Sequence, residues 1–199
     1  MQVVKQSATL LWITPDAACV IERAARTCYK SEECVAEGSA KKLILMLKER
    51  GHLAMLEHAS ASLLFVTDRG VSHEIVRHRL ASYAQESTRY CNYGKDKFGG
   101  EITVIAPPGL QGLYYDVWLS TMCQAECAYL ALLHDYSPQI ARSVLPTCLK
   151  TELVMTANFR EWLHFFSLRC SPKAHPQMQE LAGMARDILR GECPEVFVE

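Results

Sequence analysis

Segments that alternate like strands are interspersed with helical segments along this chain, and several neighbours are joined by only a few residues. Two parallel strands need a crossover of about a dozen residues or more, so connections this short exclude a purely parallel sheet. The sequence therefore predicts an α+β fold in which an antiparallel or mixed sheet packs with helices. Because there is no internal repeat, low-complexity tract or linker-like change in composition, we expect one domain over residues 1–199.

Alternating apolar and polar residues, bounded by turn residues, predict the strands. The expected strands cover residues 1–14, 60–67, 101–108 and 151–157. The segment from Ser82 to Gly100 is polar, aromatic and irregular, so we assign it no element, and its length is typical of a functional loop.

Capping residues indicate where helices begin. Thr14 before Pro15, Ser72, and Asn158 with Glu161 three positions later are all patterns of a helix start. The expected helices cover residues 16–29, 39–51, 72–76, 110–136, 137–145, 160–169 and 176–190, and residues 68–70 form a turn. The longest of these helices has enough apolar residues to lie centrally in the fold.

The composition excludes several classes of protein. The chain is 49% apolar, and its 21 Lys and Arg against 22 Asp and Glu leave a net charge of -1, so no overall field favours nucleic acid or an anionic membrane. No apolar stretch reaches the roughly 18 residues of a membrane span, and the first residues do not resemble a signal peptide. Nine cysteines, an odd number at irregular spacing, are typical of reduced thiols. We expect a soluble cytoplasmic protein.

The densest group of chemically active side chains is the string RHRLASYAQESTRY. Arg77, Arg79 and Arg89 carry planar guanidinium groups that repel one another at close range unless they share an anion. A phosphate-bearing ligand would remove that repulsion. The alternative is a solvated face on which Glu74 pairs with Arg77 or His78 at helical spacing.

The order of residues in this string favours a ligand site. Arg77, His78 and Arg79, followed by seven residues and then Ser87, resemble the signature of the flavin-dependent thymidylate synthases. Further landmarks of that family occur in the family's order over nearly the whole chain: GHLAMLEHAS, DRGVSHEIV, IARSVLP, ANFREWLHFFSLR and ECPEVF.

The resemblance implies a homotetramer of α+β subunits whose active sites lie at subunit interfaces, with FAD bound by several chains. It implies that NADPH reduces the flavin, that methylenetetrahydrofolate supplies the carbon, and that dUMP becomes dTMP without a covalent enzyme nucleophile. Neither nucleic acid nor a membrane is expected as a partner.

The resemblance also implies roles for individual residues. Flavin contacts are expected from His52, Arg77, His78, Arg79, Glu86, Asn158, Arg160 and His164. Contacts with dUMP are expected from Glu74, Ile75, Val76, Arg77, Glu86, Ser87, Thr88, Arg89, Arg142 and Arg169. Arg89 would hold the phosphate. Arg169 is the expected catalytic residue, since a cation against the uracil ring stabilises the negative charge that develops at N3 and O2.

Three positions depart from patterns found in relatives. Ala54 stands where some carry a hydroxyl that can contact the flavin, and His164 stands where some have Asn, although either side chain can donate a hydrogen bond. Thr88 replaces a Gly found in others, which affects how closely the backbone approaches the nucleotide.

Other reactive or aromatic residues are expected to have structural roles. Cys123 and Cys127 share a helix face without the further ligands of a zinc site, so we expect core packing and no metal. Packing or other structural roles are likewise expected for Cys91, His58, Trp118 and Trp162, with a place in the flavin site as the alternative for His58 and a place near the active site as the alternative for Cys91.

A nucleic-acid-binding module is the competing hypothesis from another class. Its phosphate contacts would be Arg77, Arg79, Arg89 and Lys95, and its stacking platforms would be Tyr83, Tyr90 and Tyr93. The net charge near zero counts against it. A non-catalytic flavin or nucleotide binder is a third possibility, although no signature residue is lost.

Overall fold

The computed structural model describes residues 1–198, and the chain divides into two compact units. The first unit consists of Met1–Ser7, Phe65–Arg77 and Ala84–Leu153, and the second contains the remaining described residues. Each unit is therefore built from segments that are distant in the sequence. One domain over residues 1–199 stays a prediction.

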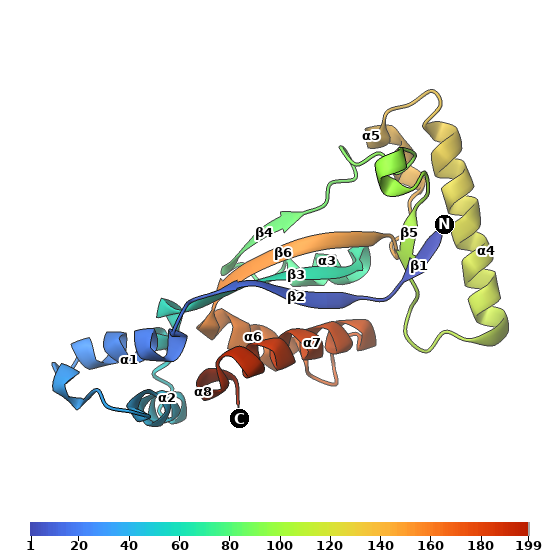
Figure 1. Ribbon diagram of the computed structural model, residues 1–199. Coiled ribbons are helices and arrows are strands. Elements are labelled where there is room, and N and C mark those ends of the chain that lie inside the picture. Colours follow the sequence, from blue (N-terminus) through green and yellow to red (C-terminus); the bar gives the residue numbers. More distant parts are fainter. Residues whose placement is uncertain (199) are drawn as a thin grey trace. The chain divides into compact units, whose positions relative to one another are not determined.

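Strands and helices occur together, which confirms the predicted α+β class (Figure 1). The strands are β1 (Gln2–Val4), β2 (Ser7–Ile13), β3 (Ser60–Asp68), β4 (Ala81–Gln85), β5 (Thr103–Ile105) and β6 (Lys150–Asn158). One sheet has the order β2-β3-β6-β4, and β1 pairs with β5 in parallel in a second sheet.

The expected opening strand over residues 1–14 is wrong as a single element, because β1 and β2 belong to different sheets. Gln6, between them, is buried and accepts a hydrogen bond from Thr67 Oγ1 at 3.4 Å. Strand β4, in contrast, lies partly within the segment to which no element was assigned.

Helices make up the rest of the regular structure (Figure 1). The α-helices are α1 (Ala17–Thr27), α2 (Ser39–Glu49), α3 (Arg69–Ile75), α4 (Gly112–Leu132), α5 (Pro138–Ala141), α6 (Phe159–Arg169), α7 (Pro176–Glu192) and α8 (Pro194–Phe197). Short 3₁₀-helices are η1 (Glu32–Cys34), η2 (Leu53–His58), η3 (Asp96–Phe98) and η4 (Arg142–Val144). The expected helix over residues 137–145 is thus divided into α5 and η4. None of the helices in the described chain combines the length and apolarity that a membrane span needs.

Two expected helix starts are wrong. Thr14 does not cap α1, because its hydroxyl exchanges hydrogen bonds with the backbone of Ser60, and α1 begins after Asp16 at φ 48°. Helix α3 begins within the expected turn, because the Asp68 carboxylate accepts from the Val71 amide at 2.7 Å, which makes Asp68 the cap in place of Ser72.

The second unit is organised around α6 and parts of β3 and β6, the two inner strands of the four-stranded sheet. Alternate residues of β3 and β6 are buried, and Thr156 on β6 donates to Ser62 on β3 at 2.9 Å. Trp162 of α6 is fully buried and its indole donates to the Ala61 carbonyl at 3.1 Å. Trp162 is therefore a packing anchor, as predicted, and it fixes α6 against β3.

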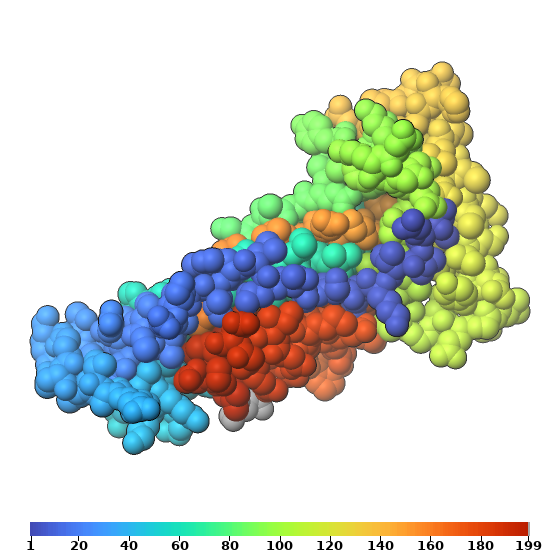
Figure 2. All heavy atoms as spheres, in the orientation of Figure 1, coloured from blue at the N-terminus to red at the C-terminus, as the bar shows by residue number. Residues whose placement is uncertain are grey.

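The first unit has its own small core beside α4. Buried residues of this core are Tyr93, Ile102, Val104, Tyr129, Ala141 and Leu149, and Trp118 and Cys91 pack against it, as predicted. The long helix is confirmed, and its buried residues are Met122 and Tyr129. Figure 2 shows α4 uncovered along its length on the face in view. Core packing of Cys123 and Cys127 was a wrong prediction, because both side chains are exposed.

Candidate active site

A cavity of about 740 Å³ lies in the second unit against α6. Its lining residues are Leu53, Glu57, Leu80, Asn158, Arg160, Glu161, Leu163, His164 and Ser167. The volume lies within the range of small-molecule sites, and the leucines supply apolar walls while the α6 side chains supply polar groups. Such a lining suits a flat, amphipathic ring.

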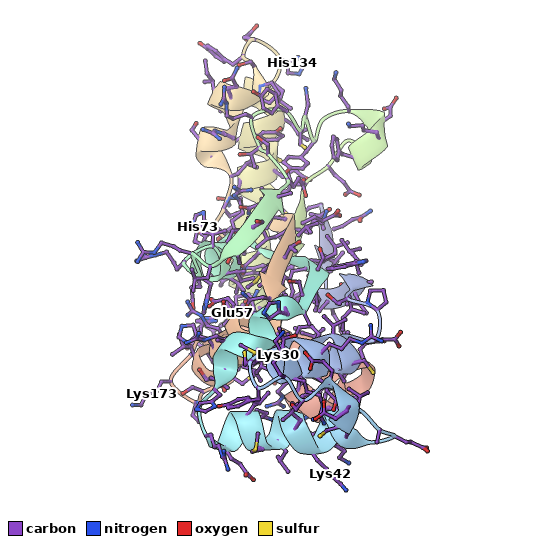
Figure 3. All side chains as sticks on the ribbon, turned by 90° about the vertical axis from the view of Figure 1, so that its left-hand side faces the viewer. Lys30, Lys42, Glu57, His73, His134 and Lys173 are labelled. Carbon is purple, nitrogen blue, oxygen red and sulfur yellow. The ribbon has the colours of Figure 1, made fainter. Side chains whose placement is uncertain are left out.

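Helix α6 carries the polar residues of this cavity at helical spacing. Asn158 caps the helix by accepting from the Glu161 amide at 2.9 Å, as the sequence predicted. Arg160 pairs with Glu57 of η2, which Figure 3 labels, at 2.7 Å on the exposed surface. His164 follows one turn later and is exposed. Three of the expected flavin contacts are therefore brought together by one helix.

Two further expected flavin contacts, His52 and Arg79, are next in the sequence to residues that line this cavity. Gly51, at φ 70°, ends α2 in a backbone conformation that residues with a side chain rarely adopt. The turn is followed by His52 and then by the lining residue Leu53. Arg79, also exposed, precedes Leu80.

His78 lies beneath this surface, with 4% of its side chain exposed. Its Nδ1 lies 3.2 Å from Glu161 Oε1, and Arg169 Nε donates to its Nε2 at 3.1 Å. Burial lowers the pKa of His78, and the nearby Arg169 cation adds to this effect, so together they outweigh Glu161, which raises it. His78 is therefore neutral at pH 7.

Tyr83 and Phe165 hold the backbone and ring of His78. The Tyr83 hydroxyl donates to the His78 carbonyl at 2.7 Å, and the Phe165 ring lies 4.9 Å from the imidazole in an edge-to-face arrangement. Burial, with a further contribution from Glu161, raises the pKa of Tyr83 to about 12. The phenol stays protonated and remains a donor.

The expected nucleotide contacts, in contrast, lie mostly in the first unit. Thr88 is buried and accepts from Arg142 Nη1 at 3.3 Å, while Arg89 Nε donates to Gln139 at 3.3 Å. Ser87 Oγ accepts from the Arg89 amide at 3.3 Å. The structure thus brings two guanidinium groups and two hydroxyls into one cluster, a donor set suited to a phosphate.

The end of α3 carries the other expected nucleotide residues of this unit. Ile75 is fully buried. Val76 follows as the C-terminal cap, Glu74 is partly buried and Arg77 is exposed. His73, labelled in Figure 3, is also exposed.

Glu86 is held by partners of its own unit. Its carboxylate accepts from the Tyr93 hydroxyl at 2.7 Å and from Lys150 at 3.2 Å. Burial raises the pKa of Tyr93, and its bond to Glu86 raises it further. Burial lowers the pKa of Lys150, but the carboxylates of Glu152 and Glu86 outweigh that effect and raise it. A flavin or nucleotide contact by Glu86 would compete with these bonds.

Sequence reasoning missed part of the site. Glu161 was noted only as part of a capping pattern, yet its carboxylate is buried against His78. The signal was a charged residue on the buried side of an apolar helix, which requires a partner. His58 was expected to be partly buried and is exposed instead, at the end of η2.

Burial and hydrogen bonding weaken the competing nucleic-acid hypothesis at two of its three stacking platforms. Tyr93 is 5% exposed and bonded to Glu86, and the Tyr83 hydroxyl is bonded to a backbone carbonyl. Tyr90 alone of these three is well exposed, at 76%.

Comparison with known proteins agrees with the resemblance. The sequence model of a family described as thymidylate synthase complementing protein matches residues 9–195. A flavin-dependent thymidylate synthase of Geobacter sulfurreducens is 34% identical over 94% of this chain and 84% of the relative. Proteins of the same name from Corynebacterium diphtheriae and Mycobacterium sp. (strain JLS) are 30% and 32% identical over 92% of this chain, covering 78% and 79% of the relatives.

Proposed function

This chain belongs to the family of flavin-dependent thymidylate synthases, and from that premise we propose that it converts dUMP to dTMP. Methylenetetrahydrofolate supplies the carbon and NADPH the reducing equivalents, so dUMP, methylenetetrahydrofolate, NADPH and a proton give dTMP, tetrahydrofolate and NADP⁺. The observation that carries the proposal is the Arg169 guanidinium fixed on His78, which belongs to the signature and whose Nδ1 contacts Glu161, a lining residue of the α6 cavity.

The cavity in the second unit is the proposed position of the flavin ring. Asn158, Arg160 and His164 would bind it from α6, and Leu53, Leu80 and Leu163 would enclose it. The lining fits an amphipathic ring because amide, guanidinium and imidazole donors stand among apolar walls. Bound FAD, once reduced, would supply the hydride that completes the methyl group. His52, Arg77, His78, Arg79 and Glu86 are the further proposed contacts.

The nucleotide is the proposed ligand of the cluster in the first unit. Arg89 and Arg142 would neutralise the phosphate, with Ser87 and Thr88 donating hydrogen bonds to it. Further proposed contacts are Glu74, Ile75, Val76, Arg77 and Glu86.

Arg169 has the proposed catalytic role. A guanidinium against the uracil ring stabilises negative charge at N3 and O2, which makes C5 nucleophilic without an enzyme thiol. The charge of Arg169 is permanent, and its bond to His78 orients it before substrate binds. Such preorganisation is how fixed charges lower an activation barrier.

We further propose a cytoplasmic homotetramer with active sites shared between subunits. Several expected contacts, among them His52, Arg77 and Arg79, are exposed in the single chain, which leaves them available to a ligand held jointly with another copy.

The test is an anaerobic assay of the purified protein with FAD, NADPH, methylenetetrahydrofolate and dUMP, following flavin absorbance and dTMP together. Flavin reduction with dTMP formation only in the complete mixture is the expected result. Flavin binding without dTMP under any condition would instead identify a binder, and no flavin binding would overturn the proposal.

A further inference from the structure

Glu161 is a buried carboxylate with a specific geometry, and the roles proposed so far do not use it. It lies in the first turn of α6, where the helix N-terminus stabilises negative charge, and 6% of its side chain is exposed. Its Oε1 lies 3.2 Å from His78 Nδ1. A buried carboxylate is costly unless it is paired, so this contact accounts for its position.

The donors around His78 fix where its proton is. Arginine is always a donor, so the 3.1 Å contact from Arg169 Nε requires a lone pair on His78 Nε2. A proton on Nε2, in either the neutral or the charged ring, would set two donors against each other. The single proton therefore lies on Nδ1, from which it is donated to Glu161.

A metal ion is a possible alternative occupant of this cluster, because ligand atoms of His78, Glu161 and His164 lie within 4.8 Å of one another. A divalent cation would have to replace the Nδ1 proton next to the permanent positive charge of Arg169. The guanidinium bond on the same ring makes the hydrogen-bonded arrangement the better assignment.

We propose that Glu161 is a positioning residue, which acts through His78 by holding the imidazole as its Nδ1–H tautomer so that Nε2 accepts from and orients Arg169. This inference rests on the proposed function, in which Arg169 is the catalytic residue. Carboxylates that orient functional imidazoles in this way are common beside metal ions and catalytic nucleophiles.

The direct test is the tautomer of His78 in protein labelled with ¹⁵N-histidine, its signals identified by their loss in His78→Asn. We expect a protonated Nδ1 and an unprotonated Nε2. Glu161→Met, which keeps the length but removes the acceptor, should abolish this preference and lower kcat about ten- to a hundredfold. FAD affinity and the KM for dUMP should change less than kcat, because the side chains proposed to contact the flavin and the nucleotide are all retained, although Glu161 itself lines the cavity.

Two further variants separate positioning from folding. Glu161→Gln retains an acceptor oxygen and should keep the Nδ1–H tautomer and lose less kcat than Glu161→Met. Glu22→Met is the matched control, because Glu22 is an equally buried carboxylate of the same unit, paired with Arg26 on α1. It should lower stability without changing the tautomer or kcat.

A protonated Nε2 in the unaltered protein, or an unchanged tautomer and kcat in Glu161→Met, would overturn the inference. The tautomer is measured without substrates, so it is independent of turnover. Absence of dTMP formation by the unaltered protein would refute the proposed function, while the NMR result would still report on the geometry.

Discussion

Arg169 is the residue on which the proposed chemistry depends most, and it is a proposed contact of dUMP, not of the flavin, with its Nε donating to His78. Arg169→Ala should therefore leave FAD bound, while dTMP formation falls by at least about a hundredfold, the scale for loss of a preorganised charge at a reacting centre. Flavin absorbance after gel filtration and single-turnover dTMP formation measure the two effects. Lys173→Ala, at an exposed lysine beyond α6 (Figure 3), is the control, and an unimpaired Arg169→Ala would refute the role.

Arg89 belongs to the other unit and to a different ligand in the proposal. Its replacement by Ala should raise the Kd for dUMP by about ten- to a hundredfold, because a charge-assisted phosphate contact is lost. Flavin affinity should change little. Calorimetric titration with dUMP and with deoxyuridine shows whether the lost phosphate contact causes the weaker binding. Deoxyuridine lacks the phosphate, so it should bind equally to the unaltered protein and to Arg89→Ala. Unchanged dUMP affinity would contradict the assignment.

The lowered pKa of His78 has a consequence for stability. The unfolded chain takes up a proton near pH 6.5, whereas folded His78 stays neutral to lower pH, so unfolding is favoured as the pH falls below that value. The folded state therefore has its full stability with respect to this histidine above pH 6.5, and it loses part of that stability as the pH falls toward the pKa of folded His78. His78→Asn removes it, so the slope of unfolding free energy against pH should decrease by at most about 1.4 kcal/mol per pH unit. Urea denaturation from pH 5 to 7.5 measures this slope, and equal slopes in both proteins would refute it.

Helix α6 shows how one element combines stability and function. Asn158 Oδ1 caps the helix, which leaves its amide group for the cavity it lines. Asn158→Ala should cost about 1 kcal/mol of stability, while Asn158→Ser keeps a capping oxygen and should cost little. Both variants lose the amide and should bind FAD more weakly. Thermal unfolding and flavin titration separate the roles, and equal destabilisation by Ser and Ala would exclude the capping contribution.

Elements with a strong local signal could be predicted from the sequence. The alternation in β3 and β6 and the Asn158 cap are local properties, and the structure confirms them. The start of α1 depends instead on Thr14 bonding to Ser60, which is distant in the sequence. The cap of α3 was missed because Asp68 ends a strand and begins a helix at the same residue.

The candidate site was predictable to a similar extent. The residue types of the signature indicated an anion ligand, but their assignment to flavin or nucleotide came from resemblance. No local pattern could show that His78 meets Glu161 and Arg169, since these contacts join residues 83 and 91 positions apart.

At the scale of the whole molecule, the proposed roles divide between the two units. The nucleotide contacts other than Arg169 belong to the first unit, and the flavin contacts other than Arg77 and Glu86 belong to the second. The family match over residues 9–195 includes residues of both units.

Helix α4 links the fold of one chain to the proposed tetramer. Leu113, Tyr114 and Val117 are 74%, 75% and 58% exposed, although the helix is largely apolar. Contiguous exposed apolar side chains indicate an interface, and a second copy of this chain is the partner that the proposed tetramer supplies. Leu113→Glu with Val117→Lys places an ion pair one helical turn apart, so the helix itself should persist.

The double variant should elute as a smaller species than the unaltered protein, with unchanged circular dichroism and reduced FAD binding, because a shared site would lose residues of the other copy. Light scattering after gel filtration measures the mass. Val35→Thr, at an exposed apolar residue outside α4, is the control and should leave mass and flavin content unchanged. An unaltered protein that is monomeric yet binds FAD fully would refute the shared site, since one chain would then supply every flavin contact.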